Sequence, residues 1–134
     1  MIAVVAESIM QVFKNSQSLQ KDIGDLYFQQ APQDIDLPYG VFYINGYTQE
    51  ELMGAASNNI TQFDIQFSLF SDATDGGEQI ATMIAALNDA YHWKVLLING
   101  WRCLKMARET VLPLLYIDET WQASIDYSLW IQEE

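Results

Sequence analysis

Few residues of this 134-residue chain have side chains suited to nucleophilic or acid–base chemistry. It has one histidine, His92, and one cysteine, Cys103. An imidazole can activate a thiol only if folding brings the two within hydrogen-bond reach and an acid, such as Asp89, orients the ring. The position of His92 at the end of a helical pattern favours a helix-capping histidine, and Cys103 fits a small buried apolar residue. We therefore expect no catalytic residue.

The acidic residues offer no better candidate. With 18 of them in the chain, some carboxylate pairs must occur, for example Glu50 with Glu51. Catalytic carboxylates need unequal environments, and these neighbours are alike. Asp72, Asp75 and Glu78 could surround a cation, but their spacing departs from the calcium-loop pattern and lacks its terminal acid. We expect no catalytic pair, no metal and no cofactor.

The charge balance restricts the partners of the chain. Its formal net charge is -12, from 18 acidic and 6 basic residues. Nucleic-acid binding depends on Lys and Arg meeting phosphates, so tight DNA or RNA binding is disfavoured, although an acidic wall would let a duplex slide past. The N-terminus has no basic lead-in, and no apolar run approaches the roughly 20 residues that cross a bilayer. We expect a cytoplasmic product with no membrane partner.

The hydrophobic periodicity predicts the elements that would position these residues. Steps of three and four predict helices over residues 2–20 and 78–91. Alternation predicts strands over residues 39–47, 60–70 and 121–131, and an Asn-Gly turn at residues 99–100 precedes a further strand. The order helix, strand, strand, helix, strand, strand predicts an α+β fold, with an antiparallel sheet of about four strands and two main helices packed on one face.

Two features suggest surfaces for partners. Residues 48–59 lie between two predicted strands and are longer than a usual hairpin connection, which favours a functional loop. The chain also has 4 tryptophans and 7 tyrosines, which are favoured at interfaces. One of them, Trp130, occupies the polar side of the last predicted strand, although it could also pack under a helix. The candidate partner-binding residues are Glu50, Glu51, Leu52, Met53 and Trp130.

The layout of these elements is similar to that of a known family over most of the chain. An Ala-Pro pair and a Leu-Pro-Tyr strand entry are followed by a strand, an acidic turn, a helix and a final strand; the residues are Ala31, Pro32, Leu37, Pro38, Tyr39, 63–72, 78–91 and 121–131. In this order the chain resembles the tail-terminator and tail-completion proteins, also called minor tail proteins, of long-tailed bacteriophages.

The resemblance implies a single tail-terminator-like domain over residues 1–134, without enzymatic activity. Such a subunit forms a hexameric ring, ends tail-tube polymerisation and joins the tail to the head. Its implied partners are copies of itself, the tail tube protein and the head-tail connector protein, and DNA only passes through the lumen. The implied location is the virion tail, assembled in the host cytoplasm. Two alternatives remain open: a head-closure or connector protein, and a small ligand-binding or hydrolytic α+β domain that uses His92.

Overall fold

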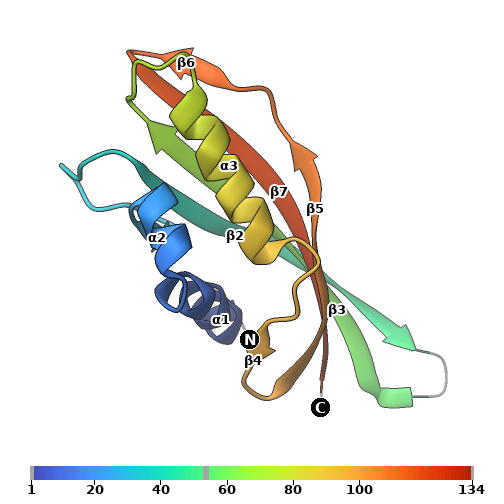
Figure 1. Ribbon diagram of the computed structural model, residues 1–134. Helices are drawn as coiled ribbons and strands as arrows, with labels where there is room; N and C mark the ends of the chain where they lie inside the picture. The colour runs from blue at the N-terminus through green and yellow to red at the C-terminus, as the bar shows by residue number, and fades with distance from the viewer. Residues whose placement is uncertain (1, 53–54, 134) are drawn as a thin grey trace.

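The computed structural model describes residues 2–52 and 55–133 and contains three helices and seven strands in this range (Figure 1). The helices are α1 (Ile2–Lys14), α2 (Gln17–Ile23) and α3 (Glu78–Tyr91). The strands are β1 (Leu26–Phe28), β2 (Tyr39–Leu52), β3 (Ala55–Ser71), β4 (Leu97–Ile98), β5 (Trp101–Val111), β6 (Leu115–Ile117) and β7 (Thr120–Glu133). None of the described helices combines the length and apolar character needed to cross a membrane.

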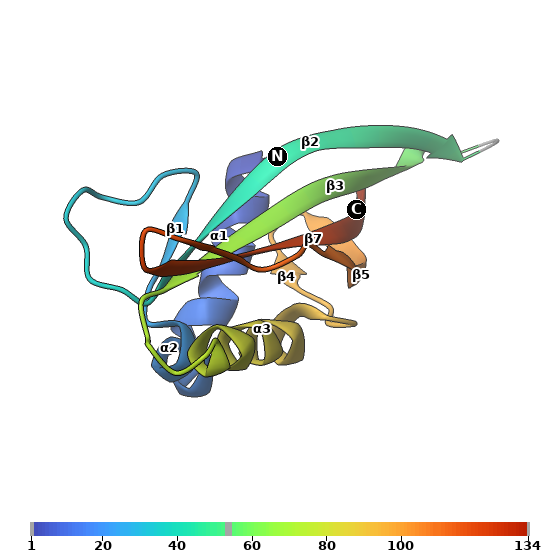
Figure 2. The same ribbon diagram turned by 90° about the horizontal axis from the view of Figure 1, so that it is seen from above.

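The seven strands form one mixed sheet in the order β1-β2-β3-β7-β5-β4, and β6 also pairs with β7. β1 is parallel to β2, and the other pairs are antiparallel. The sheet curves like half of a barrel, and the three helices lie on one of its faces (Figure 2). The predicted α+β fold with about four antiparallel strands and two helices is therefore wrong, because the chain is mostly β.

The strands that were missed are short, and this explains the error. β1 and β6 have three residues and β4 has two, too few for alternation to become visible. The single helix predicted over residues 2–20 is two helices. Ser16 begins the second one, since its hydroxyl accepts a hydrogen bond from the Leu19 amide at 3.1 Å.

The core lies between the helices and one face of the sheet. The alternation predicted for residues 60–70 and 121–131 is confirmed, because alternate side chains of β3 and β7 are buried against the helices. In the centre, the ring of Phe67 contacts those of Phe42, Tyr91 and Tyr127 at centroid distances of 5.8, 5.1 and 5.4 Å. This aromatic cluster joins α3 to three neighbouring strands.

The opposite face of the sheet, called the outer face below, carries the polar partners of this alternation. Its β3 residues include Asp64 and Gln66. Nearer β1, a row of half-buried rings crosses it, with Tyr27 6.2 Å from Tyr39 and Tyr39 5.0 Å from Phe70. The outer face is therefore polar in its centre and aromatic toward β1.

Two buried phenols of the core differ in their hydrogen bonding. Tyr91 and Tyr127 are 0% and 1% exposed. The hydroxyl of Tyr91 donates to the carbonyl of Ile9 at 2.8 Å, whereas that of Tyr127 has no partner among the described residues. We expect Tyr91→Phe to lower the free energy of unfolding by about 1–2 kcal/mol, and Tyr127→Phe to leave it unchanged or slightly higher. Denaturant unfolding of both variants at neutral pH checks this, and equal losses would contradict it.

The same pair makes stability depend on alkaline pH. Burial raises the pKa of Tyr91 and of Tyr127 above the ordinary phenol value. The folded state therefore keeps protons that the unfolded chain releases above about pH 10, so stability is complete below that pH and falls as the pH rises further. In the same unfolding series extended to alkaline pH, Tyr127→Phe should show a shallower loss than the unmodified protein.

Candidate assembly surface

The structure does not bring His92, Cys103 and Asp89 together as a catalytic group. His92 ends α3, as expected, and its Nδ1 accepts a hydrogen bond from the backbone amide of Arg108 at 2.9 Å. Cys103 lies on β5 five residues before Arg108, and along an extended strand this separates the two residues by roughly 16 Å. It is buried, and burial raises the pKa of its thiol. Asp89 lines a hollow between α2 and α3.

The acidic turn before α3 serves the helix. The two carboxylate oxygens of Asp75 accept hydrogen bonds from the backbone amides of Glu78 and Gln79 at 3.1 and 3.0 Å. This satisfies two of the amides that a helix start leaves unpaired, and it places negative charge at the positive end of the helix dipole. Across residues 2–52 and 55–133, no three His, Cys, Asp or Glu side chains gather as a metal site would require.

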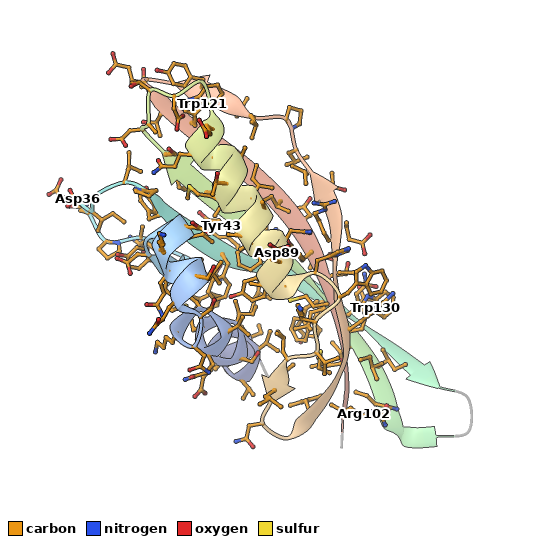
Figure 3. All side chains as sticks on the ribbon, viewed as in Figure 1. Asp36, Tyr43, Asp89, Arg102, Trp121 and Trp130 are labelled. Atoms are coloured by element: carbon orange, nitrogen blue, oxygen red, sulfur yellow. The ribbon has the colours of Figure 1, made fainter. Side chains whose placement is uncertain are left out.

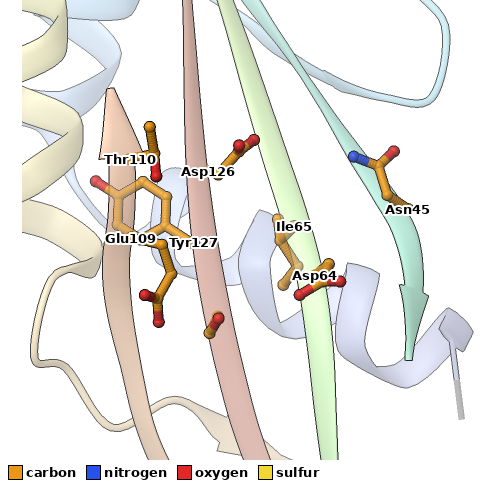
Figure 4. Close-up of a pocket in the computed structure, with 8 residues that line it drawn as sticks. Asn45, Asp64, Ile65, Glu109, Thr110, Asp126 and Tyr127 are labelled. Atoms are coloured by element: carbon orange, nitrogen blue, oxygen red, sulfur yellow. The ribbon is translucent and has the colours of Figure 1, made fainter. Parts of the chain in front are cut away.

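A hollow of about 310 Å³ lies on the sheet between β2, β3, β7 and β5 (Figure 4). Three neighbouring strands contribute the carboxylates of Asp64, Asp126 and Glu109 to its lining. Its other lining residues are Asn45, Ile65, Thr110, Tyr127 and Ser128. An acidic hollow of this kind repels phosphate, and its lining contains neither the imidazole nor the thiol of the chain.

The β2–β3 hairpin projects beyond the helices (Figures 1 and 2). The predicted loop over residues 48–59 is wrong, since pairing continues from Tyr39 opposite Phe70 to Leu52 opposite Ala55. Strands pair through backbone hydrogen bonds alone. Strands that extend beyond the helices can therefore form without the alternation of apolar and polar residues that marks a half-buried strand. Of the candidate residues, Glu50, Glu51 and Leu52 lie in the distal part of β2, and Met53 lies outside the described residues.

Trp130 lies on the outer face, between Gln62 of β3 and Lys105 of β5. The Lys105 ammonium lies 5.1 Å from the centroid of the Trp130 ring and 5.6 Å from that of Trp93. Both distances are within the range of cation–π attraction. The indole N–H of Trp130 is buried and has no acceptor in the part of the chain that the structure describes. Trp130 thus packs under a lysine rather than under a helix, and its role in partner binding stays a prediction.

A continuous run of exposed apolar side chains was not predicted from the sequence. Six large apolar side chains, from the last residue of β5 through β6, are 40–59% exposed, and they are called the apolar edge below: Val111, Leu112, Leu114, Leu115, Tyr116 and Ile117. Among the described residues, β5 and β6 pair with β7 on one side here, and no strand pairs with the other side. An open, apolar sheet edge is a ready site for another chain.

The sequence carried a signal for this edge, although a weak one. The run VLPLLYI is apolar throughout, but Pro113 interrupts it and its residues do not alternate. Pro113 has no backbone N–H to donate, and the strand pairing is interrupted around it, since residues 112–114 fall between β5 and β6. The exposure of the run could be known only once β6 had been placed at the edge.

Comparisons with known proteins give a likeness in fold. No protein-family model and no curated protein matches the sequence. A solved structure described as the virion of a native gene transfer agent particle contains a chain that superposes with a TM-score of 0.77 at 12% identity, over 92% of this chain and 91% of that one. A second solved structure superposes with a TM-score of 0.56 at 13% identity, over 96% and 95%. At these identities the likeness shows the fold alone, and that fold occurs in a virion chain.

Proposed function

We propose that this chain is a structural protein of a bacteriophage tail without enzymatic activity. In this proposal it forms a closed ring of six copies that ends the tail tube and joins it to the head. The observation that carries the proposal is the apolar edge, which leaves six large side chains in solvent in the single chain. A monomer gains nothing from such an edge, whereas a subunit buries it against its neighbour. The virion origin of a chain with the same fold supports the same class of function.

The two sides of the sheet suit a closed ring. Identical subunits related by rotation contact one another through two different surfaces, one on each side of every copy. The sheet provides two dissimilar sides, because it begins with β1 and ends with β5, β4 and β6. The acidic composition suits a channel, because a net charge of -12 on each copy would keep passing DNA from adhering.

The proposal is tested by tube assembly in solution. The chain is added to polymerising tail tube protein of the same phage, and tube lengths are measured by electron microscopy. We expect shorter tubes with an extra ring of density at one end. As a control, Leu115→Asp/Ile117→Asp, which alters the apolar edge, should leave the tubes long.

Unchanged tube lengths with no chain bound to the tubes would contradict a tail-terminator function. If the chain instead bound only the head-tail connector protein, the head-closure alternative would replace it. Neither result depends on how charge is distributed between the two sides of the sheet.

A further inference from the structure

Basic residues are concentrated on one side of the sheet. Residues 94–108 contain four of the chain's 6 basic residues and no acidic residue. All four are exposed, and they are called the basic edge below: Lys94, Arg102, Lys105 and Arg108. They lie on β5 and on the segment before β4, which runs antiparallel to β5 at the edge of the sheet.

The opposite side of the sheet has the opposite charge. Residues 25–38, which form β1 and the loop to β2, contain three acidic residues and no basic one. Asp25, Asp34 and Asp36 are all exposed, and they are called the acidic edge below. Figure 3 labels Asp36 and Arg102 on opposite sides of the molecule.

We propose that the basic edge of one copy binds the acidic edge of a second copy, so that copies associate head to tail. This inference rests on the proposed function and deepens it, because it names the surfaces that meet in the ring. With a net charge of -12, two copies repel each other over most contacts. Contact between the two edges brings opposite charges together, whereas a two-fold contact through the basic edge would place like charges face to face.

The two edges match in their apolar side chains as well as in their charges. On the basic edge, Trp93, Val95 and Leu97 are 65%, 67% and 95% exposed. On the acidic side, the half-buried Ile35 and Leu37 alternate with the aspartates. Charged and apolar groups therefore lie together on both sides, as in an interface whose apolar centre has a polar rim.

Charge also favours a protein partner over nucleic acid. A duplex approaching the basic edge would meet four basic side chains on a chain that carries 18 acidic ones. Neutralised phosphates set nucleic-acid affinity, and this balance leaves little net attraction. A short acidic segment of a second copy contacts the basic edge alone, so the positive charge of that edge is sufficient to attract it.

The test exchanges charges between the edges and measures self-association by sedimentation velocity. Arg102→Glu/Lys105→Glu makes the basic edge acidic, and Asp34→Lys/Asp36→Lys makes the acidic edge basic. We expect each double variant alone to associate at least about tenfold more weakly than the unmodified chain. An equimolar mixture of the two should associate again, and so should one chain carrying all four substitutions, because opposite charges then meet at every contact.

A matched control separates local charge from net charge. Lys14→Glu/Lys21→Glu changes the net charge by the same amount as Arg102→Glu/Lys105→Glu, but on exposed residues of α1 and α2. We expect this variant to associate like the unmodified chain. Equal weakening in both would show that net charge decides association, and it would overturn the inference.

The remaining outcomes also decide the matter. If both double variants associate like the unmodified chain, or if the mixture and the fourfold variant stay monomeric, the inference is wrong. An unmodified chain that stays monomeric at millimolar concentration would also overturn it, while ring formation on the tail tube would still support the proposed function. If Arg102→Glu/Lys105→Glu abolished retention of duplex DNA without changing association, the basic edge would be a nucleic-acid site.

Discussion

Substitution of Leu115 and Ile117 by aspartate should reduce self-association by at least about 100-fold, since each buried apolar side chain contributes about 1.5–3 kcal/mol and each new carboxylate must lose its water. These residues are 49% and 59% exposed in the single chain, so the fold should tolerate the change. They continue the same side of the sheet as the basic edge, and a neighbouring copy would cover both. Light scattering across a concentration series measures the effect.

The control for this prediction adds the same charge elsewhere. Ala81 and Ala85 are exposed residues of α3, on the helical face of the molecule. Ala81→Asp/Ala85→Asp should associate like the unmodified chain. If Leu115→Asp/Ile117→Asp also did so while remaining folded, the apolar edge would not be an assembly surface.

The largest expected effect on stability belongs to Phe67→Ala. Phe67 is 0% exposed, and its ring contacts three others in the aromatic cluster. Removing a buried phenylalanine ring costs about 3–5 kcal/mol, because apolar contacts are lost and a cavity remains. Domains of this kind have about 5–15 kcal/mol in total, so the denaturation midpoint should fall steeply.

Phe70→Ala is the matched comparison. Phe70 follows on the same strand but lies half-buried on the outer face, where its ring contacts Tyr39 at 5.0 Å. We expect a loss of about 1 kcal/mol, because solvent can fill the space that the ring leaves. Equal losses for the two variants in denaturant unfolding would show that the outer-face ring is as important to folding as the core ring.

The sequence predicted the elements whose burial repeats along the chain. β3 and β7 alternate because one face packs on the helices, and α3 begins and ends where its apolar stripe does. β1, β4 and β6 were missed because each is held by pairing with a longer neighbour, and two or three residues contain no period. The distal hairpin was missed because it projects past the helices, where backbone pairing alone joins its two strands and an alternating sequence is not required.

The candidate surface was predicted less completely than the fold. Trp130 was selected because it breaks the polar side of an alternation, and the structure places it beneath Lys105 on the outer face. The apolar edge carried only a weak signal, because an apolar run that contains Pro113 fits a buried segment equally well. In the sequence, the basic edge corresponds only to a local excess of Lys and Arg within a strongly acidic chain. Its meaning depends on β1 and β5 lying on opposite sides of the sheet, which only the topology reveals.

Electron microscopy of the purified chain at high concentration tests the proposed assembly most directly. Class averages should show closed rings of six copies, in which the β5 side of every subunit faces the β1 side of the next. Single folded copies at every concentration, with and without tail tube protein, would contradict a ring-forming role for this chain.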